Sequence, residues 1–365
     1  MPAMAIGTSV GDDVSLIALG CEPGTRFRAA SITKPFTALL ACRLLDLDRG
    51  TGVWPDDVRV RHLLSHTSGF DCELPNGDLS RLGSGEDALG AAIAELPAVK
   101  RFVGVEEIWS YANTGYWLAG HLAAGSASTT YEDALTTRVL EPLGLEATSF
   151  AEPALAGTGV GVIDGAYPRA RRPSGGLVSN VTDLVHFGRQ LLDDPAFTQM
   201  SQPHGKPIGG VYGFGLFGER IGTGDVWGHS GSYGGFQSQL LLVPAVRAVF
   251  VGLTNAGTGA KALYDVEQAF FDEVLGARRV LPQFVELSDE DLARYAGRYA
   301  NSDAAAEIQV APGGLVVAVA GEELFVRPIG NARFQVPDGP HVRERFDFPR
   351  DGLVRLGSRL AARVA

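Results

Sequence analysis

Lysine is scarce in this sequence of 365 residues. Its lysines are Lys34, Lys100, Lys206 and Lys261, and the other basic residues among the 31 cations are arginines. An arginine keeps its charge in proteins, whereas a lysine loses its proton readily when it is buried. A motif that requires a lysine therefore has few places in which to occur by chance.

Cysteine and long apolar runs are also rare. Cys21, Cys42 and Cys72 are odd in number, widely spaced and form no C-x-x-C pair, which argues against a disulfide framework and a thiolate metal site. No segment approaches the roughly 20 apolar residues that span a bilayer, and the first residues lack the basic start of a secretion signal. We therefore predict a cytoplasmic protein that uses no membrane, metal or cofactor.

Excess positive charge is missing too, since 42 acidic and 31 basic residues give a net charge of −11. Nucleic-acid binding needs clustered cations, so this balance argues against such a partner. With 45% hydrophobic and 20% charged residues, the chain has the composition of a globular protein long enough for two cores.

The hydrophobic pattern predicts an α+β fold. Residues 4–20 read as a hairpin, and the apolar spacing from Ser31 to Arg49-Gly50 indicates a long helix. Short helical patterns follow, strands return at 207–254, and a helix at 261–275 closes the segment. This order predicts an antiparallel sheet flanked by helices, with a second, helical lobe over about 51–195. The helical patterns lie at 87–96, 114–124, 131–140 and 182–192.

The composition changes after Pro282, where short alternating runs are separated by Gly, Pro and Asp. Such runs are typical of small antiparallel β-structures. We therefore predict two domains, at 1–285 and 286–365, the second a small antiparallel β-domain. The expected strands are Ala305 to Val310, Leu315 to Val319, Leu324 to Val326, Phe334 to Val336 and Arg343 to Phe348.

Ser31-Ile32-Thr33-Lys34 places a hydroxyl at a helix start and an amine one turn later on the same face. The amine could remove the hydroxyl proton, and the helix N-terminus offers free N–H groups to a developing oxyanion. The tetrapeptide alone leaves a second interpretation open, in which the serine caps the helix and the lysine is exposed.

Two further motifs favour the catalytic interpretation. Tyr111-Ala112-Asn113 supplies a phenol that can share a proton with a neutral lysine, and a carboxamide that can orient an amide substrate. His229-Ser230-Gly231-Ser232 leads into a strand-rich region, where Gly231 lets the backbone approach a ligand closely.

In this order, Ser31-x-x-Lys34, Tyr111-x-Asn113 and His229-x-Gly231 resemble the three active-site motifs of the serine β-lactamase and penicillin-binding-protein superfamily. The nearest variants are class C β-lactamases, DD-carboxypeptidases, D-aminopeptidases and related esterases. The resemblance covers about 5–280 and implies a β-lactamase-like fold. The tail from Tyr295 resembles the lipocalin-like β-domains of some members. Flanking stretches at 27–30, 63–69, 113–116 and 174–179 agree with it.

The resemblance also implies residue roles. Ser31 would be the acylated nucleophile, Lys34 its proton acceptor and Tyr111 the group that protonates the leaving group. Asn113 would hold the acyl amide, and the backbone N–H groups of Ser31 and Ser232 would form the oxyanion hole.

The implied activity is hydrolysis of a small-molecule ester or amide through an acyl-enzyme. A biosynthetic transacylase that passes the acyl group to an amine or alcohol, and a non-catalytic penicillin-binding sensor, remain as alternatives. The sequence predicts no oligomeric state.

The third motif departs from class C β-lactamases, which carry a lysine where this chain has His229. A neutral imidazole holds a substrate carboxylate less firmly than an ammonium does, so weak penicillin hydrolysis is expected. Two sets of residues have no assigned role in these motifs. Arg169, Arg171 and Arg172 could contact an anionic substrate, but a solvated loop is the favoured interpretation. Trp109, Tyr233 and Phe236 either line an acyl pocket or belong to the core.

Overall fold

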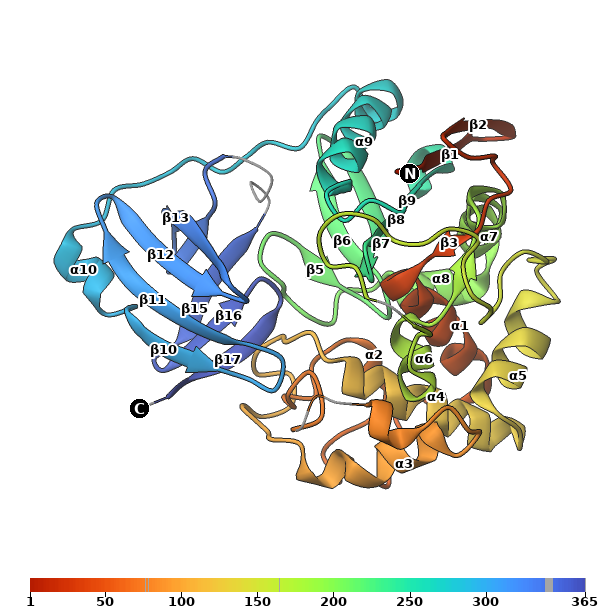
Figure 1. The fold of residues 1–365 in the computed structure, drawn as a ribbon, viewed down its shortest axis with the longest axis horizontal. Coiled ribbons are helices and arrows are strands. Elements are labelled where there is room, and N and C mark those ends of the chain that lie inside the picture. The colour runs from red at the N-terminus through yellow and green to blue at the C-terminus, as the bar shows by residue number, and fades with distance from the viewer. Residues whose placement is uncertain (76, 78, 164, 339–343, 365) are drawn as a thin grey trace.

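The computed structural model describes residues 1–75, 77, 79–163, 165–338 and 344–364. A seven-stranded antiparallel sheet with helices on both faces, a helical region below it and a closed eight-stranded barrel make up the chain (Figure 1). The predicted α+β fold class is confirmed, with an antiparallel sheet flanked by helices and a C-terminal antiparallel β-structure. None of the helices within the described residues is long and apolar enough to cross a membrane.

The large sheet has the strand order β2-β1-β9-β8-β7-β6-β5. The predicted hairpin at its edge is confirmed, and the turn between β7 and β8 contains Gly234 and Gly235 with φ of +61° and +81°. Such positive φ values are what a two-residue hairpin turn requires. The strands are β1 (Met4–Val10), β2 (Asp13–Leu19), β5 (Val211–Tyr212), β6 (Phe217–Ile221), β7 (Gly224–Tyr233), β8 (Phe236–Val243) and β9 (Ala248–Thr254).

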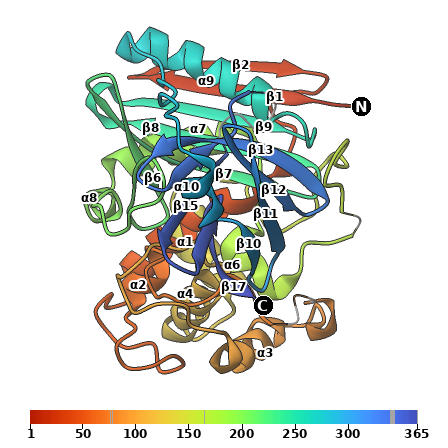
Figure 2. The ribbon, with the colours of Figure 1, turned by 90° about the vertical axis from the view of Figure 1, so that its left-hand side faces the viewer.

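Helices cover the two faces of this sheet. Helix α9 (Ala260–Leu275) lies on one face, as Figure 2 shows, and packs Phe270 against Phe250 of the sheet. Helix α7 (Val181–Asp193) lies on the other, where a side chain at Gly7 would come 2.7 Å from Val185 Cγ2. Thus α7, expected in the helical lobe, covers the sheet.

The helical region contains most of the predicted helices, with two differences at their ends. The long helix α1 (Thr33–Leu44) begins after a 3-10 turn at Ala30–Ile32. It ends before the predicted stop at Arg49-Gly50, because Leu45 is already extended. The pattern at 131–140 forms α5 (Tyr131–Leu135) and continues as a π-helical turn, Thr136–Leu140. The other elements between β2 and β5 are α2 (Val60–Leu64), α3 (Ala88–Glu95), α4 (Asn113–Ala127), α6 (Arg172–Gly175), α8 (Pro195–Met200), β3 (Phe27–Arg28) and β4 (Val178–Ser179).

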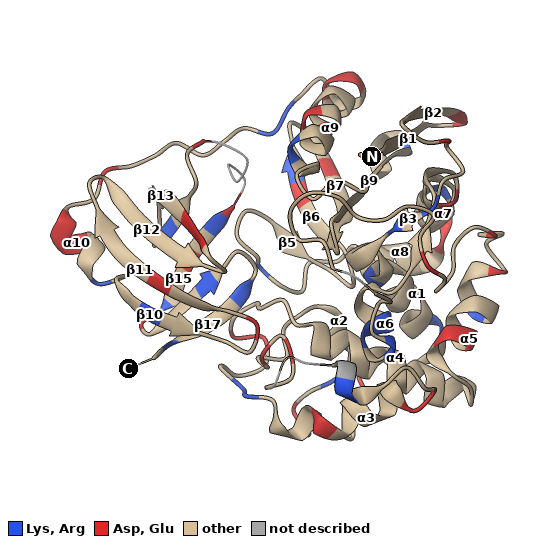
Figure 3. Ribbon diagram, in the orientation of Figure 1, with Lys and Arg blue, Asp and Glu red and all other residues tan. Residues whose placement is uncertain are grey.

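The barrel follows α10 (Asp289–Ala293), whose first turn is acidic (Figure 3). Its strands pair with their neighbours in chain order, and β10 closes onto β17. Two of these strands, β16 and β17, are absent from the predicted set, and Arg343, the predicted start of one strand, lies outside the described residues. The strands are β10 (Gly297–Ala300), β11 (Ala305–Ala311), β12 (Gly314–Val319), β13 (Glu322–Gly330), β14 (Arg333–Gln335), β15 (Arg345–Arg350), β16 (Leu353–Leu356) and β17 (Arg359–Val364).

Candidate active site

Ser31 lies in the 3-10 turn before α1, where the chain passes close to β7. Ala30, just before it, has φ of +46°, an uncommon conformation for a residue with a Cβ atom. A Cβ at Gly231 would lie 2.9 Å from Ser31 N and 2.5 Å from Ala29 O. The glycine therefore lets β7 come against the backbone of Ser31.

Lys34 is buried one turn further along the chain, with 0% of its surface exposed. Its Nζ lies 3.2 Å from Ser31 Oγ and donates a hydrogen bond to Ser174 O at 2.6 Å. Burial holds the pKa of Lys34 well below its ordinary value, and the cations Arg359 and Arg171 lower it further. The interpretation of Lys34 as an exposed lysine is therefore wrong.

Tyr111 completes a group of three side chains around the hydroxyl. Its OH donates to Ser31 Oγ at 2.9 Å. Burial raises the pKa of Tyr111 above its ordinary value, although the hydrogen bond to Ser31 acts in the opposite direction. The phenol is consequently protonated near neutral pH and can donate.

Consecutive backbone N–H groups hold the Tyr111 segment in place. Tyr111 N donates to Ser358 O of the barrel at 2.9 Å, and the next N–H, of Ala112, donates to His66 Nδ1 at 3.1 Å. Because His66 Nδ1 accepts this bond and burial holds the pKa of His66 well below its usual range, the imidazole is neutral. The N–H groups of Ser110 and Asn113 donate to His66 O and Cys72 O.

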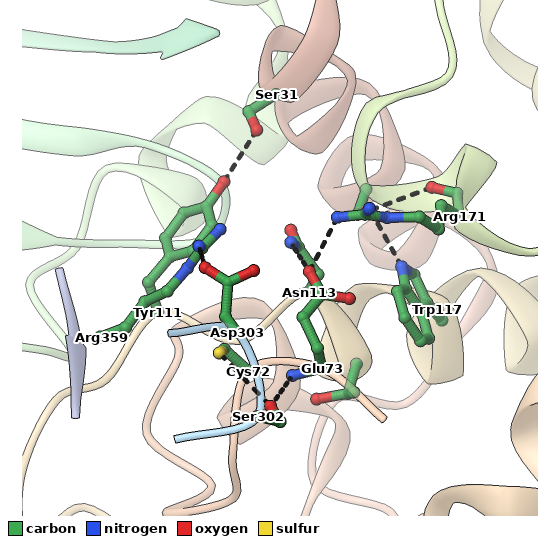
Figure 4. A network of polar contacts seen from close by, with 12 residues as sticks. Ser31, Cys72, Glu73, Tyr111, Asn113, Trp117, Arg171, Ser302, Asp303 and Arg359 are labelled. Atoms are coloured by element: carbon green, nitrogen blue, oxygen red, sulfur yellow. Dashed lines mark hydrogen bonds and ion pairs between the residues drawn. The ribbon is translucent and has the colours of Figure 1, made fainter. Parts of the chain in front are cut away.

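Asn113 belongs to a buried polar network that Figure 4 shows. Its Nδ2 donates to Glu73 Oε1 at 2.6 Å, and Arg171 donates to the same oxygen at 2.7 Å. The expectation that Arg171 lies in a solvated loop is wrong, because it pairs with the buried Glu73. Its neighbours Arg169 and Arg172 both pair with Glu132.

His229 is buried on β7, next to the nucleophile. Its Nδ1 lies 2.6 Å from Ser230 O, and a carbonyl can only accept, so Nδ1 carries the proton. Burial lowers the pKa of His229 to about 3, and the nearby amine of Lys34, when protonated, acts in the same direction. The ring is neutral, and Nε2, which has no hydrogen-bond partner among the described residues, is an acceptor.

Ser232 lies on the same strand and offers its backbone. Tyr233 and Phe236 flank the two-residue turn, so the register makes Ser232 and Gln237 a non-hydrogen-bonded pair. The N–H of Ser232 consequently points away from β8, on the side where the pairing with β6 has ended at Gly228. The register therefore gives the N–H of Ser232 no partner on β8 or β6.

The sequence left open whether three aromatic residues line an acyl pocket or belong to the core, and two of them are buried in the core. Trp109 and Phe236 are 3% and 2% exposed. Tyr233 is half-buried and packs edge-on against Tyr167.

The sequence motifs did not identify several residues of the site. Ser174 and His66 lie in two of the flanking stretches that agree with the family resemblance, so this agreement could have marked them as candidate site residues. Glu73 and Arg359 have no local signature, because contacts between distant segments bring them to the site.

The chain belongs to the Beta-lactamase family, whose model matches residues 1–270. It is 27% identical over 364 residues to penicillin-binding protein 4 of Amycolatopsis lactamdurans, an alignment that covers 82% of this chain and 93% of that protein. Both findings confirm the resemblance to the serine β-lactamase and penicillin-binding-protein superfamily.

Solved structures agree on the fold. SurE superposes with a TM-score of 0.78 at 23% identity, over 99% of this chain and 95% of SurE. D-amino acid amidase from Ochrobactrum anthropi SV3 superposes with a TM-score of 0.63 at 24% identity, over 74% of this chain and 95% of the amidase. The first of these similarities extends through the barrel.

Proposed function

We propose that the chain is a serine hydrolase that cleaves a small amide or ester through an acyl-enzyme on Ser31. One observation carries the proposal: Ser31 Oγ lies 3.2 Å from the buried Nζ of Lys34 and 2.9 Å from the phenol of Tyr111. A hydroxyl between a neutral amine and a protonated phenol has both a proton acceptor and a proton donor at hand.

The steps follow from this arrangement. Lys34 Nζ takes the hydroxyl proton as Ser31 Oγ bonds to the substrate carbonyl carbon. The backbone N–H groups of Ser31 and Ser232 stabilise the oxyanion. Tyr111 gives its proton to the leaving nitrogen or oxygen as that bond breaks, and regains a proton from Lys34. Water then attacks the ester under the same base, which releases the acid and frees Ser31.

Three lines of support favour an amide as the substrate. The Asn113 carboxamide, held by Glu73, is one of the polar groups drawn with Ser31 and Tyr111 in Figure 4, and it could pair with an acyl amide. The neutral His229 would accept a hydrogen bond at Nε2 and brings no positive charge for a carboxylate. Relatives in fold include an enzyme described as a D-amino acid amidase.

Covalent labelling tests the nucleophile. Incubation with a fluorophosphonate should add one label, and peptide mapping should place it on Ser31. The Ser31→Ala variant should lose the label, whereas Ser126→Ala, which removes an exposed serine of α4, should keep it. A label that survives Ser31→Ala would reject the proposal.

Product analysis tests the reaction. With D- and L-amino acid amides as substrates, we expect the free acid and ammonia, and no product with the Ser31→Ala variant. A new amide formed from an added amine, with no free acid, would support the transacylase instead. Acylation without turnover would support the sensor.

A further inference from the structure

The turn between β16 and β17 of the barrel lies against the Tyr111 segment. Ser358 O accepts the hydrogen bond of Tyr111 N at 2.9 Å, and Leu360 N donates to Ser110 Oγ at 3.0 Å. Residues more than 240 positions apart are thus joined on both sides of Arg359. The barrel fixes the backbone that carries the phenol.

Arg359 projects from this turn toward the reaction centre (Figure 4). Its Cζ lies 5.8 Å from the centre of the Tyr111 ring, and Lys34 Nζ lies 4.7 Å from the same ring centre. The guanidinium pairs with Asp303, from the segment between β10 and β11, and its Nε has no hydrogen-bond partner among the described residues. The guanidinium of Arg359 and the amine of Lys34 therefore both lie near the ring of Tyr111.

We propose that Arg359 is a positioning residue through which the barrel acts on catalysis: it holds the Tyr111 ring and keeps Lys34 in its neutral, proton-accepting form. A nearby cation disfavours a second positive charge, so the guanidinium opposes protonation of the amine. The proposal rests on the proposed function, in which Lys34 accepts the proton of Ser31.

The other groups around Lys34 define how large this effect can be. Arg171 also opposes protonation of the lysine, whereas Glu73 favours it. His66 and His229 are neutral imidazoles, and Tyr111 and Tyr116 are protonated phenols whose rings face the amine. Removal of Arg359 would also leave the carboxylate of Asp303 without this partner. The unpaired carboxylate would further favour protonation of Lys34.

Substitutions of opposite sign test the proposal. Below the pKa of Lys34 the amine is protonated and inactive, so kcat/KM falls with decreasing pH. Arg359→Gln removes a cation and should move this acid limb upward by about one pH unit. Asp303→Asn leaves the cation without its counterion and should move the limb downward. The double variant should return close to the parent profile, and Arg359→Lys should show a smaller shift than Arg359→Gln.

Controls separate this effect from damage to the fold. Arg298→Gln removes an exposed barrel cation and should leave the limb in place. Thermal unfolding of each variant tests whether it is folded, and Asp303→Asn tests the sign of the shift even if Arg359→Gln fails to fold. Shifts in the same direction for both substitutions, or no shift while Ser31 remains essential, would overturn the proposal. Activity that survives Ser31→Ala would instead reject the proposed function.

Discussion

Lys34 is surrounded by neutral and positive groups and by one carboxylate that acts on it from a distance, Glu73. Within the described residues no carboxylate lies within ion-pair distance of its Nζ. Its direct partners are the hydroxyl of Ser31 and the carbonyl of Ser174. Burial of a charged amine without a counterion is costly, so the folded state favours the free base. The scarcity of lysine in the sequence fits this role, because a guanidinium could not replace the amine.

The first prediction concerns this side chain. Lys34→Arg should lower kcat/KM by at least about 10³, because the guanidinium stays charged and cannot accept a proton. It should also destabilise the fold, whereas Lys34→Met should lose activity to a similar extent and remain more stable than Lys34→Arg. Steady-state kinetics and urea unfolding measure the two effects. An active Lys34→Arg variant would contradict the assigned role.

His229 and His66 predict how stability depends on pH. Both are neutral in the fold, with the pKa of His229 at about 3 against an ordinary value of 6.5. The unfolded chain takes up these protons below its own pKa of 6.5, so the stability is present above pH 6.5 and is lost as the pH falls. At pH 5 the neutral His229 should cost about 2 kcal/mol relative to pH 7, and His66 should act in the same direction. His229→Gln should reduce the slope of unfolding free energy against pH, and an unchanged slope would argue against a neutral His229.

At the scale of the elements, β7 and the start of α1 depend on each other at one glycine. Gly231→Ala would place a Cβ 2.5 Å from Ala29 O and 2.9 Å from Ser31 N, so the turn that carries Ser31 must shift. We expect acylation to slow by about 10² or more, because the nucleophile and one oxyanion donor move together. The control Gly90→Ala, in α3 where the added methyl meets open space, should leave acylation unchanged and stabilise the fold by about 0.5–1 kcal/mol. Equal acylation rates in the two variants would contradict this account.

The elements also show how far sequence reasoning reaches. Ser31, Lys34 and Tyr111 could be found because their spacing follows one helix and two short motifs, and these three come together in the fold. Strand β17, Arg-Leu-Ala-Ala-Arg-Val, has few β-branched or aromatic residues, so its propensity is weak and its conformation comes from pairing with β10 and β16. The same long-range pairing brings Arg359 to the site, and no local pattern could reveal that.

At the scale of the whole molecule, a buried ion pair of the barrel supports the contact between the barrel and the preceding part of the chain, residues 1–285. Arg355 and Asp347, with 6% and 10% of their side chains exposed, pair with each other, and Arg355 also donates to Trp109 O and Lys206 O. A small apolar cluster lies beside them, formed by Leu353 and Leu360 of the barrel with Val103. We propose the division at residue 285/286 as the domain boundary, with this contact joining the two domains.

Removing one partner of the Arg355–Asp347 pair should lower the free energy of unfolding more than replacing both partners with apolar residues. Arg355→Ala leaves Asp347 buried without its partner and should lower the free energy of unfolding by about 3–5 kcal/mol. The double variant Arg355→Met, Asp347→Leu should recover much of that loss, since apolar residues of similar size can replace a buried pair. Urea unfolding of the full chain measures both. A double variant less stable than Arg355→Ala would show that the charges themselves hold the contact.

The acyl-enzyme on Ser31 is tested most directly by rapid-quench mass spectrometry of the intact protein with a slowly hydrolysed activated ester. The account predicts one acyl group per chain that appears within the first turnover, maps to Ser31 and decays as the acid is released. Steady production of acid with no acylated protein, or an acyl group that maps elsewhere, would contradict it.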